Sequence, residues 1–469
     1  MAERIATEVL ARLRDVLGPT GLREGEKLAE LDPGVERRNL DSGVAAIPAT
    51  TVEVARVVAI CRDHKIPIVP LGGRTGLAGA GVSKPGELVL LTNRLNRIIG
   101  IDVAAGTATV EAGVVLSALA AAAYEHRLTP AIDLGARDSC TIGGMIGTNA
   151  GGMEAHRHGT MRRRVLGLEV VMPDGSVLSD LKAVLKNNEG YDLKQLFIGA
   201  EGTLGIVTRV VLKLEPDPGE RAIAYCHLTD AAAAIELLRR LKRLPGGVML
   251  TRAEIMWREH VNLTAKANGL NHLCLPEGAG VTVIFEVASH EPDAARQALE
   301  GELGRVLEDN NEVCGLIDVL VPKNAKETRD IWHIREDWAV GRAFPYGIHF
   351  DISVPLERIE PYMRSLRAAV AAHDPKLNVF ALGHLADGNL HVTINQAGPP
   401  IPEKVEAAAA LIYSGLHEIG GSISAEHGIG LNKRAGLARF GDPVKLAMMR
   451  KVKQAVDPDG LMNPGKVVV

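Results

Sequence analysis

The sequence predicts an α+β protein of two or three domains, and three observations support this class. The chain has 469 residues, more than one typical hydrophobic core can organise. Apolar runs of strand length alternate with longer amphipathic stretches of helical period. A proline-rich break at 216–219 separates two such patterns. We therefore expect a helical lead-in at 1–37, a first domain at 38–216, a second domain at 217–420 and a C-terminal segment at 421–469.

Composition and charge exclude several classes of protein. Hydrophobic residues make up 46% of the chain and charged residues 23%, and the formal net charge of −4 gives no basic surface for nucleic acid or a membrane. Apolar runs such as 114–124 are too short to span a bilayer, and the opening Met1-Ala2-Glu3-Arg4 leads into an amphipathic helix rather than a signal peptide. We expect a cytoplasmic protein with no membrane span and no nucleic-acid partner. Five dispersed cysteines fit reduced thiols and offer no disulfide, zinc or iron–sulfur pattern: Cys61, Cys140, Cys226, Cys274 and Cys314.

Helix and strand signals follow one another in a readable order. Leu10, Leu13 and Leu17 share one face of the lead-in helix. Thr50 or Thr51 caps a helix at 51–63, and the turn at 173–175 predicts a hairpin. Before the break, strands are expected at 66–70, 88–92, 98–103, 107–111, 165–171 and 176–178, with a further strand ending at 214 and a helix at 116–126. After the break, helices are expected at 231–244 and 293–308, with strands near 248–253 and 281–287.

The glycine-rich stretch 133–152 is the part around which the first domain is organised. Six of its twenty residues are glycine, so it has few side chains to bury and is expected to form neither a core strand nor a core helix. Backbone of this kind can lie against a ligand, because glycine allows close approach and successive N–H groups bind anions. A flexible linker is disfavoured, since Ile142, Met145 and Ile146 recur at a buried spacing.

Two more glycine turns, at 72–81 and 199–205, indicate an extended ligand rather than a lone phosphate. A Gly-x-Gly-x-x-Gly fingerprint is excluded because Lys84 stands where the third glycine is needed, and the pair Gly465-Lys466 is followed by valine, which excludes a Walker loop. Three turns in one domain suit a dinucleotide that the backbone holds along its length.

Five motifs in this order resemble a known family. They are Pro70-Leu71-Gly72-Gly73-Arg74-Thr75-Gly76-Leu77, Ser139-Cys140-Thr141-Ile142-Gly143-Gly144, Thr148-Asn149-Ala150-Gly151-Gly152, Gly199-Ala200-Glu201-Gly202-Thr203-Leu204-Gly205-Ile206-Val207 and Asn463-Pro464-Gly465-Lys466. The set resembles the FAD-binding domain of the vanillyl-alcohol oxidase/p-cresol methylhydroxylase (PCMH) superfamily, and most closely its branch of FAD-dependent D-2-hydroxyacid dehydrogenases, which act on D-lactate, D-2-hydroxyglutarate or glycolate. The resemblance implies a two-subdomain PCMH-type FAD-binding domain and an α+β substrate (cap) domain with an antiparallel sheet.

The same resemblance implies where FAD binds. The first turn and the central stretch would hold the pyrophosphate and isoalloxazine, residues 201–207 the adenosine end, and Asn463 would return to the flavin. Covalent attachment elsewhere in the superfamily uses His or Cys, and His156, His158 and Cys140 lie nearby in the sequence, but this branch generally holds FAD non-covalently. The expected FAD-binding residues are Pro70, Gly72, Gly73, Arg74, Thr75, Gly76, Leu77, Leu134, Gly135, Ser139, Cys140, Thr141, Gly143, Gly144, Gly147, Thr148, Asn149, Gly151, Gly152, Glu201, Gly202, Gly205, Ile206, Val207 and Asn463.

A second constellation lies in the C-terminal third. His384 and His391 are seven residues apart, and the Asp387-Gly388-Asn389 turn between them can fold the chain back and bring both imidazoles to one point. The segment 424–430 adds the carboxylate of Glu426. Two histidines and a glutamate with an open fourth position are the ligands of a catalytic Zn²⁺-type site, although Mn²⁺ or Co²⁺ would also fit. A structural histidine pair is the alternative.

Glu426 and His427 are neighbours whose side chains point in different directions, so they need different tasks. The resemblance assigns His384, His391 and Glu426 to the metal and His427 to substrate as general base, and imidazole titrates near neutrality, as proton abstraction requires. Arg335, on an expected helix, resembles the arginine that grips the substrate carboxylate. The alternative for Arg335 is an ion pair at i,i+4 on the surface.

Several positions depart from the 2-hydroxyglutarate specialists of the branch. Their Lys-Tyr-Asp is His349-Phe350-Asp351 here, a threonine becomes Ala339, and an asparagine becomes Thr393. Fewer donors therefore remain for a distal carboxylate, which favours a less polar side chain such as that of lactate, another aliphatic 2-hydroxyacid, or mandelate. Trp338 would pack against that side chain, with a place in the core as the alternative. The expected substrate residues are Arg335, Trp338, His349, Thr393 and His427.

The sequence thus predicts an FAD- and metal-dependent D-2-hydroxyacid dehydrogenase that passes electrons to an external acceptor, either a quinone, an electron-transfer flavoprotein or a cytochrome. Catalysis would fall to His427 and Arg335. A non-catalytic FAD subunit of a glycolate oxidase complex and a metal-free oxidase of the superfamily are the alternatives, and a homodimer is left open.

Overall fold

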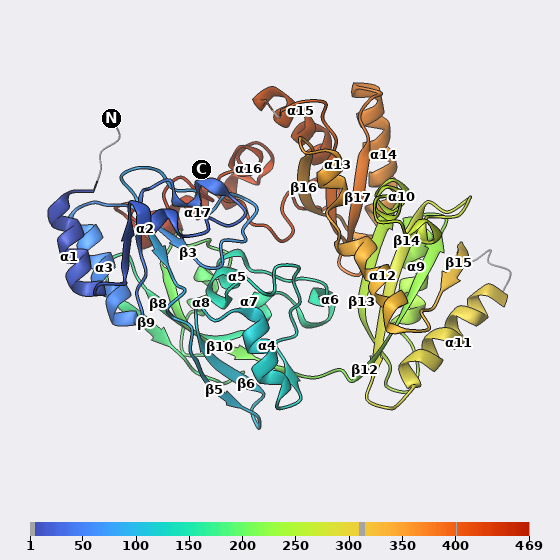
Figure 1. The fold of residues 1–469 in the computed structure, drawn as a ribbon, viewed down its shortest axis with the longest axis horizontal. Coiled ribbons are helices and arrows are strands. Elements are labelled where there is room, and N and C mark those ends of the chain that lie inside the picture. Colours follow the sequence, from blue (N-terminus) through green and yellow to red (C-terminus); the bar gives the residue numbers. More distant parts are fainter. Residues whose placement is uncertain (1–4, 309–314, 400, 469) are drawn as a thin grey trace. The chain divides into compact units, whose positions relative to one another are not determined.

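The computed structural model describes residues 5–308, 315–399 and 401–468 (Figure 1). Contacts divide the chain into two compact units, each described here by itself. Unit 1 comprises Met1–Gly152, His158–Asp217 and Glu426–Val469, and unit 2 comprises Met153–Arg157 and Pro218–Ala425. The opening Met1-Ala2-Glu3-Arg4 and Cys314, both interpreted above, lie outside the described residues.

The first sheet of unit 1 has the order β1-β2-β4-β3. Its strands are β1 (Leu22–Glu24), β2 (Val44–Ala46), β4 (Leu88–Leu91) and β3 (Ile68–Leu71), of which β2, β4 and β3 run parallel. Helices α1 (Thr7–Leu17) and α3 (Thr51–Asp63) contact each other beside this sheet, and their apolar faces join its strands in one core (Figure 1). The predicted helix at 51–63 is confirmed, and its cap is Thr50, whose hydroxyl accepts the N–H of Glu53 at 3.1 Å. The lead-in contains strand β1 as well as α1 and α2 (Glu26–Ala29).

The second sheet of unit 1 is antiparallel, with the order β5-β6-β10-β8-β9. Its strands are β5 (Ile98–Asp102), β6 (Thr107–Glu111), β10 (Ile206–Lys213), β8 (Val165–Val171) and β9 (Val177–Asp180). The hairpin predicted at 173–175 is confirmed as β8–β9. The apolar sides of β6, β8 and β10 pack with α4 (Leu116–Tyr124) and α5 (Ile142–Thr148) in a second core. The smaller elements are β7 (Leu128–Thr129), α7 (Met161–Arg164), α8 (Lys194–Phe197) and β11 (Glu215–Pro216).

Helix α5 shows that one expectation was wrong, because the stretch 133–152 does contain a buried helix. Thr141 caps it, accepting the N–H of Gly144 at 3.4 Å, and Asn149 ends it in the left-handed conformation. Ile142, Met145 and Ile146 lie on one face and are buried. The glycines weaken the helix locally, but three well-placed side chains suffice for packing to stabilise it. A Cβ at Gly143 would lie 2.7 Å from Cβ of Ala112, so glycine permits this close approach.

The C-terminal segment is an integral part of unit 1. The N–H of Ile68 donates to the carbonyl of Leu461, and the N–H of Asn463 donates to the carbonyl of Ile68, both at 2.8 Å. Residues 461–463 therefore extend the first sheet beside β3. Helices α16 (Arg434–Phe440) and α17 (Pro443–Val456) precede this return.

Unit 2 is organised around an antiparallel sheet with the order β15-β12-β14-β13-β17-β18-β16, as far as the described residues show. The strands are β15 (Leu316–Leu320), β12 (Glu220–Leu228), β14 (Val281–Ser289), β13 (Met249–Trp257), β17 (Val379–His384), β18 (Asn389–Ile394) and β16 (Ile348–Ser353). Every residue of β14 is buried, because helices cover both faces of the sheet. The α+β class with an antiparallel sheet is confirmed.

Different helices of unit 2 pack on different parts of the sheet. Val261 of α10 (Arg258–Ala267) and Ile331 and Ile334 of α12 (Ala325–Glu336) pack on one face, in a core with Tyr225 and Ile284. Helices α9 (Ala231–Leu241) and α11 (Ala294–Glu308) contact β12 and β14, and α14 (Ile359–His373) contacts α9. The remaining helices are α13 (Ala339–Ala343) and α15 (Pro402–Tyr413). The side chains described below lie on the face that α10 and α12 partly cover.

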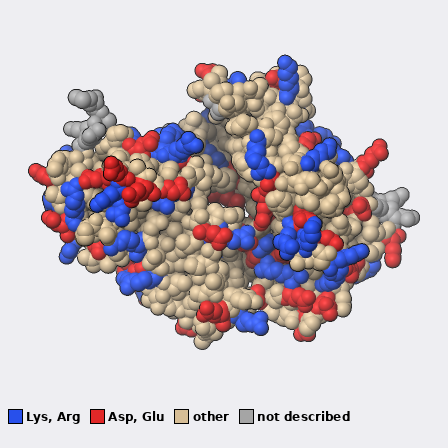
Figure 2. Space-filling view, in the orientation of Figure 1, with Lys and Arg blue, Asp and Glu red and all other residues tan. Residues whose placement is uncertain are grey.

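Lys and Arg side chains are interspersed with Asp and Glu side chains on the face shown in Figure 2, in keeping with the small net charge. Within the described ranges, none of the helices has both the length and the apolar character needed to cross a membrane. Cys61, Cys140, Cys226 and Cys274 are free thiols, and burial raises the pKa of Cys61 to about 12 and that of Cys140 to about 11.

Candidate active site

The hairpin β17–β18 places two histidines on one face of the unit 2 sheet. Gly388 in its turn has a φ of 80°, and a Cβ there would collide with the carbonyl oxygen of Val354, so this position requires glycine. The turn pairs His391 with Leu382, which puts His391 and His384 on the same face. Their ring centroids lie 5.5 Å apart at an interplanar angle of 86°. The prediction that this turn brings the two imidazoles together is confirmed.

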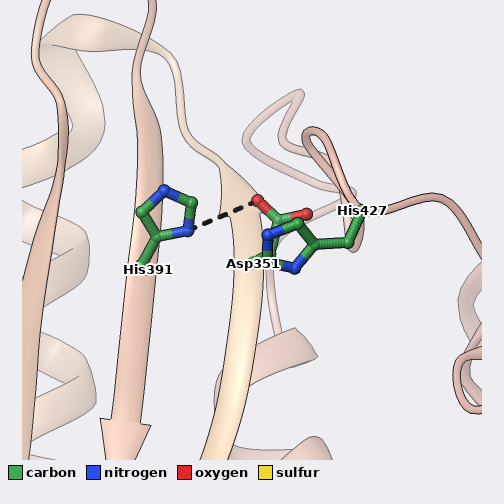
Figure 3. Close-up of side chains that lie close together, drawn as sticks. All are labelled: Asp351, His391 and His427. Carbon is green, nitrogen blue, oxygen red and sulfur yellow. Dashed lines mark ion pairs between the residues drawn. The ribbon is translucent and has the colours of Figure 1, made fainter. Parts of the chain in front are cut away.

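Each of these histidines faces a buried carboxylate on the neighbouring strand. Glu254 of β13 is the direct cross-strand partner of His384, and Asp351 of β16 is that of His391. Oε1 of Glu254 lies 2.7 Å from Nδ1 of His384, and Oδ1 of Asp351 lies 3.7 Å from Nδ1 of His391. Figure 3 shows the His391 ring directed toward Asp351, with the ion pair as a dashed line. Carboxylates in this position orient metal-binding imidazoles in proteins.

Glu254 also binds Arg335, the predicted substrate arginine. Oε2 of Glu254 lies 2.8 Å from Nε of Arg335 on α12, and the Glu254 side chain has no exposed surface. Burial alone would raise the pKa of Glu254, but the charges and hydrogen bonds of His384 and Arg335 lower it to about 2. Arg335 is itself largely buried, and its partner lies on another element, so the alternative of an i,i+4 surface pair is wrong.

Asp351 fixes the other side of the hairpin. Its Oδ1 accepts a hydrogen bond from Nδ2 of Asn389 at 2.9 Å, and its Oδ2 accepts one from the N–H of Ala425 at 3.1 Å. Asp351 is 1% exposed. It therefore ties strand β16 to the turn of the hairpin and to the last residue of unit 2.

Neither Glu254 nor Asp351 was assigned a role from the sequence. A usable signal existed for Glu254, because it is a carboxylate inside an apolar strand, followed by Ile255-Met256-Trp257. Its partners, 81 and 130 residues away, could not be read from that signal.

Three predicted substrate residues meet beside His391. Thr393 follows on the same face of β18, and its Oγ1 lies 2.8 Å from Nδ1 of His349, its cross-strand partner. The ring of Trp338 lies 5.0 Å from that of His349. Trp338 is 62% exposed, so the alternative of a place in the core is wrong. The face that bears the histidines therefore also carries the aromatic ring of Trp338 and the polar groups of His349 and Thr393.

Glu426 and His427 belong to unit 1, where they are half-buried at the start of its C-terminal segment. Oε1 of Glu426 accepts the N–H of Gly152 at 2.7 Å, which links it to the end of the predicted FAD-binding stretch. Gly428 follows with a φ of 77°. Both predicted residues are therefore held next to the glycine-rich backbone of unit 1.

Glu201 holds the backbone that follows His427. Its Oε1 accepts the N–H of Ile429 at 2.7 Å, and its Oε2 accepts the N–H of Gly430 at 2.9 Å. Burial raises the pKa of Glu201 to about 7, although the two N–H groups and the charge of Lys433 act in the opposite direction. Its carboxylate thus fixes the backbone of the segment 428–430 by hydrogen bonds, a role that the sequence did not indicate.

The three glycine turns converge in unit 1. A Cβ at Gly72 would collide with Oγ1 of Thr141, and one at Gly202 would lie 2.5 Å from Cγ of Pro70. The N–H of Glu201 donates to the carbonyl of Gly147 at 2.8 Å. The three turns therefore pack against one another through backbone and small side chains.

Asn463 lies against the same turns. It is 1% exposed, and its Nδ2 donates to the carbonyls of Ala80 at 3.0 Å and Glu201 at 2.7 Å. Its Oδ1 has no hydrogen-bond partner among the described residues. A buried acceptor without a partner is rare and costly, and a bound donor would satisfy it, so these residues fit a dinucleotide.

Comparison with known proteins agrees with this geometry. Residues 217–467 match the family described as FAD linked oxidases, C-terminal domain, and residues 43–180 match the FAD binding domain. Mitochondrial D-2-hydroxyglutarate dehydrogenase of Bos taurus is 34% identical over 430 residues, spanning 91% of this chain and 77% of its own. D-2-hydroxyglutarate dehydrogenase of Xanthomonas citri pv. viticola is 34% identical over 433 residues, spanning 90% and 88%.

Solved structures show the same fold at lower identity. Substrate-bound p-cresol methylhydroxylase matches with a TM-score of 0.73 and 18% identity, over 98% of this chain and 96% of that one. The 4-ethylphenol oxidase from Gulosibacter chungangensis matches with a TM-score of 0.73 and 20% identity, over 99% and 98%. The PCMH-type fold predicted from the motifs is confirmed.

Proposed function

This chain belongs to the FAD-linked oxidases, in their branch of FAD-dependent D-2-hydroxyacid dehydrogenases, and from that premise we propose that it oxidises a D-2-hydroxyacid with a weakly polar side chain to the 2-oxoacid. The observation that carries the proposal is the grouping on unit 2. Two histidines, each backed by a carboxylate, share one face of the sheet with an arginine bound to one of those carboxylates.

We propose that His384 and His391 supply two nitrogen ligands of a divalent metal and that Glu426 of unit 1 supplies the carboxylate. This donor set suits Zn²⁺, and Mn²⁺ or Co²⁺ are alternatives. A hydrogen bond from Nδ1–H of His384 to Glu254 puts the lone pair on Nε2, the form in which imidazole coordinates metals. A divalent metal, when bound, polarises a coordinated hydroxyl and lowers its pKa.

The substrate carboxylate would bind Arg335. Glu254 accepts from Nε, so the fork formed by Nη1 and Nη2 can receive two carboxylate oxygens end-on. His427 would then remove the hydroxyl proton as general base. FAD, when bound, supplies the redox chemistry by accepting hydride at N5, while the protein supplies orientation.

The side chain of the substrate would contact Trp338, His349 and Thr393. His349 and Thr393 hydrogen-bond to each other, and Trp338 offers an aromatic face. This supports an aliphatic or aryl substituent, such as that of D-lactate or D-mandelate, over a distal carboxylate. D-2-Hydroxyglutarate is the second candidate, because the curated relatives carry that substrate in their names.

A panel of D- and L-2-hydroxyacids tests the proposal through bleaching of the flavin absorbance without oxygen. We expect bleaching with D-lactate or D-mandelate and none with the L enantiomers. Bleaching by D-2-hydroxyglutarate alone would remove the side-chain assignment, and no bleaching by any 2-hydroxyacid would overturn the function.

The electron acceptor would be a quinone, an electron-transfer flavoprotein or a cytochrome. Turnover of the isolated chain with an artificial acceptor separates this proposal from a non-catalytic subunit of a glycolate oxidase complex, which would show none. Full activity after complete metal removal would instead favour a metal-free oxidase.

A further inference from the structure

Glu254 occupies the centre of the grouping on unit 2. It lies on β13, between β14 and β17, on the face that bears His384. Among the described residues, each of its oxygens has one partner: Oε1 has the imidazole of His384 at 2.7 Å, and Oε2 has the guanidinium of Arg335 at 2.8 Å. One buried carboxylate thus connects two side chains that come from different elements.

Two contacts do not by themselves separate Glu254 from a structural carboxylate, because buried carboxylates are generally paired; the identity of its partners does. The same face of the sheet supplies the comparison: Glu286 on β14 is 4% exposed, and its Oε1 accepts from Nη1 of Arg221 at 2.7 Å and from the hydroxyl of Thr251 at 2.8 Å, with Nε of Arg252 at 3.4 Å. Glu286 satisfies the requirement that a buried charge be paired. Its partners have no place in the proposed chemistry, whereas both partners of Glu254 do.

We infer that Glu254 is a positioning residue that holds the metal-binding His384 and the carboxylate-binding Arg335 in one register. The inference rests on the function proposed above. Because Glu254 accepts from Nδ1–H of His384, it selects the tautomer in which Nε2 of His384 can coordinate a metal. Because Glu254 accepts from Nε of Arg335, the Nη1 and Nη2 groups remain available for a substrate carboxylate. One residue that does not contact the substrate would thereby set the spacing between the group that binds the hydroxyl of a 2-hydroxyacid and the group that binds its carboxylate.

The substitution Glu254→Gln separates this role from a merely structural one. An amide of nearly the same shape has one acceptor atom, while the two contacts of Glu254 require two. Whichever way the amide is oriented, its NH₂ group opposes either Nδ1–H of His384 or Nε–H of Arg335. One of the two partners must therefore lose its orientation.

The first readout is the affinity of the metal-free, FAD-loaded protein for Zn²⁺, measured by competition with a chromogenic chelator. The second is the split between KM and kcat for the best 2-hydroxyacid. For Glu254→Gln we expect Zn²⁺ affinity to fall about 10- to 100-fold, or KM to rise about tenfold or more, as for one lost hydrogen bond to a charged group. The control Glu286→Gln should lower stability and leave both values unchanged.

Wild-type values for both Zn²⁺ affinity and KM in Glu254→Gln would overturn the inference. Equal changes in Zn²⁺ affinity and KM in Glu286→Gln would also overturn the inference, because they would show that loss of any buried carboxylate on this sheet disturbs the site. If Glu254→Gln does not fold, Glu254→Asp keeps the charge but shortens its reach, and the same losses are expected.

A third readout is independent of metal and substrate. In protein with ¹⁵N-labelled histidine, the ring resonances lost in His384→Gln report the tautomer of His384. We expect the Nδ1–H form in the wild type and a loss of that form in Glu254→Gln or Glu254→Asp. A wild type that binds no Zn²⁺ and oxidises no 2-hydroxyacid would defeat the proposed function, whereas an unchanged tautomer together with a wild-type KM in both variants would defeat the role of Glu254.

Discussion

Two buried glutamates show how single residues of this protein respond to their surroundings. Glu254 faces an imidazole and a guanidinium, which lower its pKa to about 2 in spite of burial. Glu201 faces backbone N–H groups, and burial raises its pKa to about 7. The difference arises because full charges compensate for lost hydration better than peptide dipoles do.

Glu201 gives a prediction about pH. Its pKa in the folded protein exceeds its unfolded value of about 4.5, so between these two values the folded state binds more protons. Its contribution to stability is complete below about pH 4.5 and is lost as the pH rises to about 7. In urea unfolding, the free energy of unfolding of the wild type should therefore fall relative to that of Glu201→Gln across this range. A relative rise would contradict the assignment.

His427 gives a prediction about catalysis. The variant His427→Ala should fold, bind FAD and remain yellow, while kcat falls at least about 10²-fold because no group removes the hydroxyl proton. Stopped-flow reduction of the flavin by substrate measures this step directly. The exposed His417 serves as the matched control, and His417→Ala should retain wild-type rates. Normal flavin reduction in His427→Ala would remove the base from the mechanism.

At the scale of elements, the hairpin β17–β18 is the decisive unit, because its register determines where both histidines point. A slip of one residue would turn His391 to the other face of the sheet. Asp351 and Gly388 oppose such a slip, the first through Asn389 and the second through its left-handed conformation.

The substitution Gly388→Ala tests this element. The backbone at residue 388 has a positive φ, and a Cβ there would collide with the carbonyl oxygen of Val354. We therefore expect a loss of about 1–3 kcal/mol in the free energy of unfolding and weaker Zn²⁺ binding. Gly301→Ala is the control, because a Cβ there has open space within α11. The control should be neutral or slightly stabilising in the same denaturation experiment. Unchanged Zn²⁺ affinity in Gly388→Ala would show that the turn does not position the histidines.

At the scale of the whole molecule, the proposed metal gives a further prediction. Prolonged treatment with a chelator should abolish turnover while FAD stays bound, because the proposed metal ligands and the glycine turns proposed to hold FAD are separate groups of residues. Added Zn²⁺ or Mn²⁺ should restore activity. The flavin absorbance at each stage provides the control for cofactor loss, and indifference to chelation would exclude metal dependence.

Global stability should also decrease in mild acid. Burial lowers the pKa of His227 and of His260 to about 4, below the unfolded value of about 6.5. Between these values the unfolded chain binds more protons, so stability is complete above about pH 6.5 and is lost as the pH falls toward 4. Melting temperatures between pH 7 and 4.5 measure this loss, which should be shallower in His227→Asn. An identical slope in that variant would contradict the role of His227.

The sequence by itself determined the local features of this protein. Thr50 or Thr51 marked the start of α3, and Asp387-Gly388-Asn389 marked the hairpin β17–β18. The glycine turns marked the backbone that we propose holds FAD. These features depend on capping, backbone freedom and hydrophobic period, all of which act over a few residues. Helix α5 escaped prediction because its glycines argue against a helix locally, and burial of Ile142, Met145 and Ile146 outweighs them.

Only the tertiary structure decided which side chains share a site. Glu254 and His384 meet because β13 and β17 pair across 130 residues, and Glu201 reaches Gly430 across 229. Such pairings are selected by the packing of whole strands and segments, and no short stretch of sequence encodes them. The sequence therefore named the candidate ligands and the candidate base, while the fold placed the buried carboxylates Glu254 and Asp351 beside His384 and His391.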